Sequence, residues 1–230
     1  MCGRFTLITK PHRLRERFGL DAAADDLAPR YNIAPSQPVL VIPNRTQRRL
    51  RPARWGLIPH WARDAASAHR MINARAETLA SRAAFRAALE RRRCLIPADG
   101  FYEWQRAARG RRAPFYVRRR DAEPFAFAGL WDVWRPAVGE PIASCTIITT
   151  ESNELLSAIH DRMPVILAPE AYATWLAPTP QHPDALRPLL VPCPAEWLEA
   201  YRVSTLVNSP ANDDAACIAP LAPSPEATSA

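Results

Sequence analysis

The distribution of apolar and polar residues predicts a chain built mainly from short β-strands. Successive side chains of a strand point to opposite faces, so an apolar period of two indicates a strand with one buried face. The segments at 38–42 and 49–55 flank a polar turn and are predicted to pair. The predicted strands are Arg4–Ile8, Pro38–Ile42, Arg49–Trp55, Cys94–Ile96, Phe101–Gln105, Pro114–Arg118, Pro124–Leu130, Cys145–Thr149 and Val203–Val207.

Helical periodicity is clearest over Ser81–Arg92. Phe85 and Leu89 fall on one face together with two alanines, Ser81 is a favoured N-cap residue, and arginines occupy the last turn. Shorter helices are predicted at Pro11–Phe18, Asn153–Ala158, Glu170–Leu176 and Ala195–Arg202. Many strands with a few interspersed helices indicate the α+β class, with a curved, mostly antiparallel sheet that forms a barrel-like core.

The length and composition indicate one domain. The chain has 230 residues, 48% of them hydrophobic, which is enough for one substantial core, and no internal repeat or linker divides it. The predicted domain covers residues 1–218. From residue 219 to residue 230 the chain consists largely of Ala, Pro, Ser and Thr, a composition that cannot bury a core, so this end is predicted to be a disordered tail.

The charge and the cysteines limit the function classes. The net charge is +7, and a polyanion such as nucleic acid is the expected partner. The five cysteines are scattered without a C-x-x-C pair, so neither a disulfide framework nor a metal site is expected. No run approaches the ~18–20 apolar residues of a membrane span. We therefore expect a cytoplasmic protein that has no metal or organic cofactor and does not bind membranes.

Cys2 directly follows the initiator methionine. Removal of Met1 would leave Cys2 with a free α-amine beside its thiol. The amine condenses with an aldehyde to a Schiff base, and the thiol then closes a five-membered thiazolidine ring. An α-amine titrates near ~7.7–8.0, so a useful fraction of it is nucleophilic at neutral pH.

Four local clusters place polar groups in apolar surroundings. They are 1–5 (MCGRF), 72–78 (INARAET), 98–104 (ADGFYEW) and 159–164 (IHDRMP). Together with 30–35 (RYNIAP) and 55–61 (WGLIPHW), they resemble, in the expected order, the SRAP family of abasic-site processing proteins. The resemblance runs from Cys2 to about Asn208.

The resemblance implies a sensor of abasic sites in single-stranded DNA that crosslinks its N-terminal cysteine to the aldehyde of the ring-opened sugar. Family members are also classed as peptidases because of the loss of the leading residue. In this sequence Cys2 matches the nucleophile and Asn73 the amide that binds the trapped sugar. Glu103 matches the general acid/base, and its aromatic neighbours predict a desolvated carboxylate with a raised pKa. His160 matches the group that helps to open the sugar ring.

The flanking residues predict the DNA contacts. Arg4, Arg75 and Arg162 each adjoin a catalytic position and are predicted to clamp phosphates. Ion pairs with nearby carboxylates are the alternative for these arginines. Trp61 and Trp104 are predicted to stack on bases, with core packing as the alternative. Many relatives carry a second aromatic after the position of Trp61, where this chain has Ala62.

The arginine runs 91–93 and 118–120 form either a wider positive field or a solvated face. Single-stranded DNA containing abasic sites is the expected partner of a monomeric, nucleoid-associated protein, with the replication machinery as a further partner. Because a Schiff base opens a route to β-elimination, weak lyase activity is also expected. Two other functions fit the sequence: an N-terminal-nucleophile amidohydrolase that uses Cys2, and a non-catalytic single-strand binder.

Overall fold

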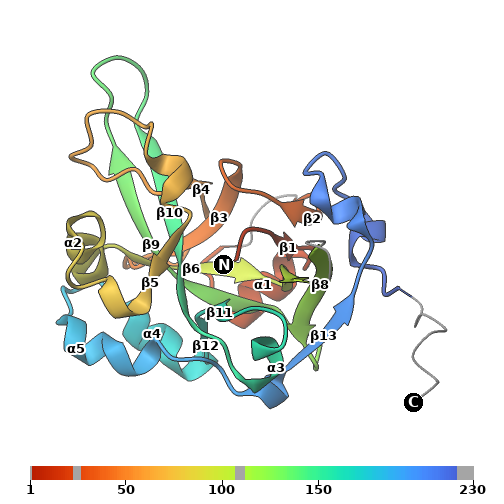
Figure 1. Ribbon diagram of the computed structural model, residues 1–230. Coiled ribbons are helices and arrows are strands. Elements are labelled where there is room, and N and C mark those ends of the chain that lie inside the picture. The colour runs from red at the N-terminus through yellow and green to blue at the C-terminus, as the bar shows by residue number, and fades with distance from the viewer. Residues whose placement is uncertain (1, 23–26, 107–111, 222–230) are drawn as a thin grey trace, which may run out of the picture.

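The computed structural model describes residues 2–22, 27–106 and 112–221, whose strands form two sheets (Figure 1). The first sheet is antiparallel throughout. Its strands, in spatial order, are β13 (Leu198–Arg202), β8 (Arg112–Arg119), β7 (Gly100–Arg106), β1 (Phe5–Leu7) and β2 (Arg30–Ile33). The N-terminal strand β1 thus lies between β7 and β2, inside the sheet rather than at its edge.

The second sheet closes on itself. Strand β9 pairs with both β6 and β10, so β10, β4, β3, β6 and β9 form a five-stranded barrel. Strands β11, β12 and β5 extend it from β10 and β9. The bounds are β3 (Pro38–Pro43), β4 (Arg51–Trp55), β5 (Asn73–Arg75), β6 (Arg93–Ala98), β9 (Phe125–Trp134), β10 (Ile142–Glu151), β11 (Arg162–Pro164) and β12 (Ile166–Leu167). The predicted barrel-like, mostly antiparallel α+β fold is confirmed.

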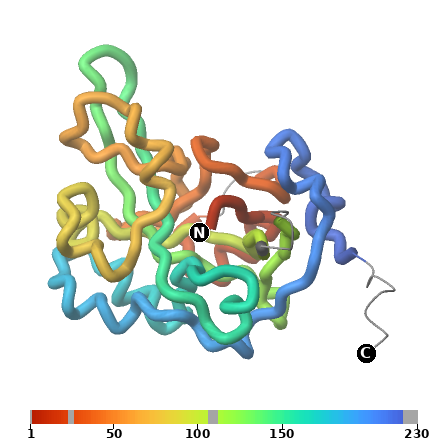
Figure 2. The backbone as a smooth tube through the Cα atoms, viewed as in Figure 1, coloured from red at the N-terminus to blue at the C-terminus, as the bar shows by residue number. Residues whose placement is uncertain are grey.

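Short helices cover the outside of the barrel. They are α1 (Pro11–Phe18), α2 (Ala83–Arg91), α3 (Glu154–Ser157), α4 (Tyr172–Trp175) and α5 (Pro183–Leu186). Figure 2 shows the chain around α2 beside the chain from α4 to α5, and the Gln181 N–H donates to the Glu90 carbonyl at 3.0 Å between them. Within the described ranges, no helix is long and apolar enough to cross a membrane.

Two predicted elements near the C-terminus are wrong. The helix predicted at Ala195–Arg202 is a single 3-10 turn followed by β13, because residues 198–202 pair with the edge of β8. The strand predicted at Val203–Val207 is largely the 3-10 turn Thr205–Asn208, which is capped by the Ser204 hydroxyl. Helix α2 begins at Ala83, two residues after the predicted N-cap. In both wrong elements, tertiary pairing and capping overrode the local pattern.

The predicted tail begins with ordered residues. Pro220 forms a β-bridge with Val203, and the Leu221 N–H donates to the Arg202 carbonyl at 2.9 Å. Residues 222–230 lie outside the described residues.

Arg93 is fully buried at the start of β6, so its assignment to a solvated or DNA-facing run is wrong. Burial lowers its pKa to about 10, which leaves it charged at neutral pH. Its guanidinium donates to carbonyls at the ends of α2 and α4, where the helix dipoles favour a cation. The acceptors are the carbonyl oxygens of Leu89, Glu90, Trp175, Ala177 and Thr179.

Replacing Arg93 by Met should lower the free energy of unfolding by about 3 kcal/mol, since several buried carbonyls would lose their donors. Urea unfolding measures this. The matched control is Arg91→Met, because Arg91 is exposed and lies only two residues earlier; it should change stability by less than about 0.5 kcal/mol. Equal losses in the two variants would contradict the capping role.

Candidate active site

Cys2 lies three residues before the start of β1, at Phe5. Phe5 pairs with Phe101, and the Tyr102 N–H donates to the Arg4 carbonyl at 3.0 Å, so the antiparallel register places Glu103 beside the residues that precede Arg4. The Cys2 side chain is fully buried, and its thiol donates to the Arg4 carbonyl at 3.9 Å. Burial, and secondarily the negative charge of Glu103, raises the pKa of the thiol. The thiol is therefore neutral in this site.

Asn73 reaches Cys2 from the other side. Strand β5 runs parallel to β10, with Asn73 opposite Ile147, and the Asn73 Nδ2–H donates to the Cys2 carbonyl at 2.8 Å. The Oδ1 atom of Asn73 is buried and has no hydrogen-bond partner among the described residues. A buried amide oxygen without a donor is costly. This atom is thus ready to accept a hydrogen bond from a ligand.

Glu103 is buried in β7, with 2% of its surface exposed. Burial is the main cause that raises its pKa to about 7, and the charge of Asp161 adds to the rise. Both protonation states are populated near neutral pH, as a proton carrier requires.

Because the pKa of Glu103 is raised, folding is favoured while the group is protonated. The contribution of Glu103 to the free energy of unfolding is complete below the ordinary pKa of 4.5 and is lost as the pH rises through about 7. Glu103→Gln cannot ionise, so its stability relative to the parent should increase by about 3 kcal/mol between about pH 4 and about pH 8. Chemical denaturation across that range measures this. The exposed Glu140→Gln is the control, and a relative stability of the Glu103 variant that does not change with pH would refute the coupling.

His160 follows α3 and is partly exposed. Its Nδ1 accepts the Arg162 backbone N–H at 3.0 Å, and a carboxylate oxygen of Asp161 lies 2.9 Å from the same nitrogen. One nitrogen cannot accept and donate at once. A neutral ring that accepts from Arg162 through Nδ1 carries its proton on Nε2.

The three predicted clamp arginines differ in their surroundings. Arg75 is exposed at the end of β5. Arg162 forms a bidentate ion pair with Glu77, with N–O distances of 2.6 and 3.1 Å. For this arginine, the ion pair that was the alternative to a phosphate contact is therefore present. The Nε of Arg162 is nevertheless buried without an acceptor in the described chain. Arg4 donates to the side chain of Asn32 at 2.8 Å and to backbone carbonyls of the C-terminal segment.

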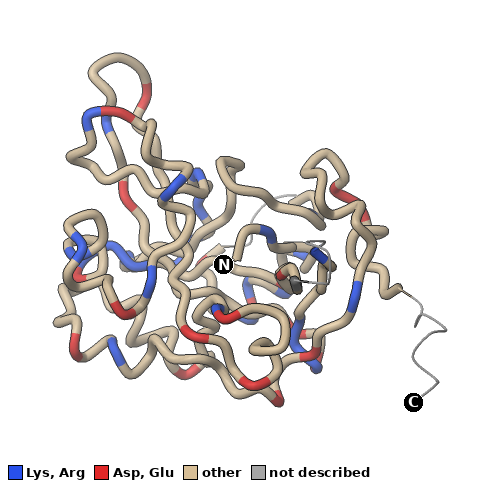
Figure 3. The backbone as a smooth tube through the Cα atoms, in the orientation of Figure 1, with Lys and Arg blue, Asp and Glu red and all other residues tan. Residues whose placement is uncertain are grey.

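The two predicted stacking residues are both accessible. Trp61 is 57% exposed, which excludes core packing. Trp104 is partly buried and lines, with His160 and Asp161, a polar hollow of about 380 Å³ next to Glu103. Figure 3 shows basic positions distributed over both sheets and interrupted by acidic ones. Arg118 pairs with Glu199 at 2.6 Å, which reduces the contribution of the 118–120 run to a positive field.

Sequence reasoning missed the residues that brace the site. The Thr149 carbonyl accepts from Arg162 at 2.7 Å, and buried Asn32 donates to three carbonyls of the C-terminal segment. Their position in strands with apolar neighbours gave no sign of these contacts. No group of three or more potential metal ligands occurs within the ranges described above.

A family model described as SOS response associated peptidase (SRAP) matches residues 1–210, which include all of the site. The chain belongs to the SRAP family.

Among SRAP relatives, the chain is 48% identical over 216 residues to the abasic site processing protein YoqW of Bacillus subtilis, covering 93% of this chain and 96% of the relative. It is 34% identical to the abasic site processing protein HMCES of Gallus gallus, over 84% of this chain and 66% of the relative. A crystal structure of a Bacteroides thetaiotaomicron protein superposes with a TM-score of 0.86 at 27% identity, covering 96% of this chain and 100% of that one. These similarities identify the two-sheet fold as an SRAP fold.

Proposed function

We propose that this protein is an abasic-site sensor for single-stranded DNA that crosslinks through Cys2 once Met1 has been removed. The observation that carries the proposal is the contact of the Asn73 amide with the Cys2 carbonyl, beside a buried carboxylate, Glu103, whose pKa is about 7. The names of the relatives, which refer to abasic site processing, support the substrate.

The reaction is a condensation that needs no oxidant or cofactor. The α-amine of Cys2 attacks the C1′ aldehyde of the ring-opened sugar, and the carbinolamine loses water to give a Schiff base. The thiol sulfur then adds to the imine carbon, and its proton passes to the nitrogen. The net change is the loss of one water molecule.

The site residues have distinct roles in this sequence. Protonated Glu103 donates to the departing hydroxyl, and its carboxylate then accepts the proton of the neutral Cys2 thiol as the ring closes. His160 exchanges a proton with the sugar as it opens. The unpartnered Asn73 Oδ1 accepts a hydrogen bond from the trapped sugar.

Binding and selectivity have separate physical origins. Arg75 and Arg162 bind phosphates without reading sequence, so the affinity falls as the salt concentration rises. Selectivity follows from chemistry, because the sugar of an intact nucleotide has no free aldehyde. β-Elimination from the Schiff base gives weak lyase activity that competes with ring closure. A monomer in the cytoplasm, close to the nucleoid and the replication machinery, fits this role.

The test uses protein whose intact mass confirms loss of Met1. It is mixed with a single-stranded oligonucleotide that carries one abasic site, without borohydride. We expect a heat-stable adduct whose mass equals the sum of the two components less one water. An oligonucleotide with a tetrahydrofuran residue, which lacks the aldehyde, should give none. No adduct from the abasic oligonucleotide would overturn the proposal.

The same preparation separates the two other functions. Turnover of amide substrates without DNA, together with no adduct, would indicate an N-terminal-nucleophile hydrolase. DNA binding without either reaction would indicate a non-catalytic binder.

A further inference from the structure

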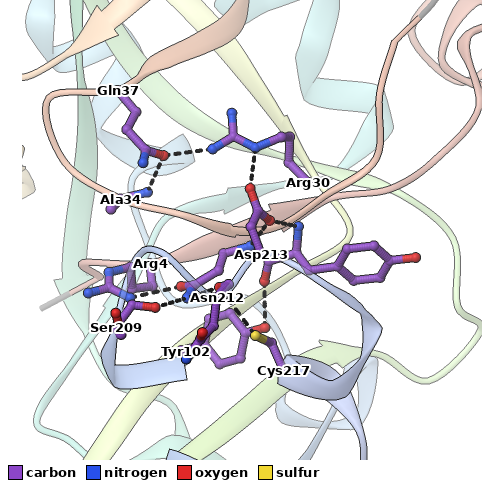
Figure 4. Close-up of polar contacts among 11 residues, drawn as sticks. Arg4, Arg30, Ala34, Gln37, Tyr102, Ser209, Asn212, Asp213 and Cys217 are labelled. Carbon is purple, nitrogen blue, oxygen red and sulfur yellow. Dashed lines mark hydrogen bonds and ion pairs between the residues drawn. The ribbon is translucent and has the colours of Figure 1, made fainter. Parts of the chain in front are cut away.

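The C-terminal segment 205–218 is fastened to β2 by its backbone carbonyls and by the Asp213 side chain (Figure 4). The amide of fully buried Asn32 donates to the carbonyls of Val207, Ser209 and Asn212, at 3.2, 3.0 and 2.7 Å. Asp213 accepts the Asn32 N–H at 2.8 Å and pairs with Arg30. These bonds fix the segment across the first sheet, next to β1 and β7.

Asn208 lies within this fixed segment and contacts two side chains beside the site. Its Oδ1 accepts the Nε1–H of Trp104 at 2.8 Å. Its carbonyl accepts the Nη2–H of Arg4 at 3.1 Å. Trp104 directly follows Glu103, and Arg4 comes two residues after Cys2. Asn208, although distant in sequence, is thus hydrogen-bonded to a residue of β7 and to the residue that directly precedes β1.

The bond from Asn208 fixes the orientation of the indole. The Trp104 ring is partly exposed and lines the hollow that also contains His160 and Asp161. An indole held only by its chain can rotate about two side-chain torsions, and ordering it on binding costs affinity. With its N–H anchored at one edge, the ring is already oriented before DNA arrives.

We infer that Asn208 is a positioning residue for DNA binding: its side-chain amide holds Trp104 in the orientation in which the ring meets a base next to the abasic site. The inference rests on the proposed function, because it takes abasic single-stranded DNA as the ligand.

The test measures equilibrium binding of an oligonucleotide carrying a tetrahydrofuran residue, which cannot crosslink, by fluorescence anisotropy. Asn208→Ala should bind roughly three- to tenfold more weakly than the parent, the loss expected from ordering one side chain on binding. Asn212→Ala is the matched control. The Asn212 amide donates only within the segment, to the Leu206 carbonyl at 2.8 Å, so this variant should bind like the parent.

A double-mutant cycle separates positioning from a general structural effect. Trp104→Phe keeps an aromatic ring but has no N–H, so adding Asn208→Ala in that background should cause no further loss of affinity. Three results would each overturn the inference. Asn208→Ala could weaken binding as much in the Trp104→Phe background as in the parent, Asn212→Ala could weaken binding as much as Asn208→Ala does, or Asn208→Ala could leave binding unchanged. Thermal melting of all variants verifies that they fold.

Failure of the proposed function has a different result. If the parent binds the tetrahydrofuran oligonucleotide but forms no adduct with the abasic one, the crosslinking proposal fails, and the binding cycle still decides the role of Asn208. If the parent binds neither the tetrahydrofuran oligonucleotide nor the abasic one, the proposed function and the inference about Asn208 both fail.

Discussion

Cys2→Ala should form no heat-stable adduct with an abasic oligonucleotide. The variant retains the α-amine but lacks the thiol that closes the ring, so its Schiff base remains open to hydrolysis. Borohydride reduction should still trap a covalent product, since it acts on the Schiff base itself. Denaturing gels and intact mass with and without borohydride measure both outcomes.

The matched control is Cys193→Ala, which also removes a buried free thiol but leaves the site intact. It should crosslink like the parent. A heat-stable adduct of normal mass from Cys2→Ala, without reduction, would refute the thiazolidine mechanism. If the borohydride-trapped product is lost as well, either the α-amine of the variant does not form the Schiff base or the variant does not bind the DNA.

Glu103→Gln should slow crosslinking at saturating DNA by about 10²- to 10⁴-fold, the range that general acid/base groups contribute. The amide keeps the size of the side chain but cannot donate or accept the proton at neutral pH. The parent should show an inflection of the rate near pH 7, because the pKa of Glu103 is about 7. The variant should lose that inflection and keep the rise of the α-amine near ~7.7–8.0.

Single-turnover crosslinking across this pH range makes the measurement, and anisotropy with the tetrahydrofuran oligonucleotide verifies that binding is retained. Equal rates and equal pH profiles for parent and variant would remove Glu103 from the mechanism. Because the variant should also be more stable at alkaline pH, slow crosslinking cannot be attributed to unfolding. If the proposed mechanism holds, the parent thus loses stability to hold an ionisable carboxyl where the proposed reaction needs it.

The sequence by itself determined the fold class and indicated the candidate reactive groups. Alternating apolar residues predicted most strands, and the hairpin of β3 and β4 is confirmed. Aromatic residues around Glu103 predicted its desolvation and raised pKa, because neighbours along a strand are close whatever the topology. The proposal that Cys2 is the reactive group rests on its place directly after Met1.

Tertiary structure decided what these groups touch. The contact of Asn73 with the Cys2 carbonyl joins residues 71 positions apart, and it depends on β5 pairing with β10. The burial of Arg93 depends on two helices ending at one point, although its sequence context is a polar arginine run. The bond between Asn208 and Trp104 arises because β2 fastens the C-terminal segment. Local patterns report which face of an element is apolar, whereas partners distant in the chain are set by how sheets and segments pack.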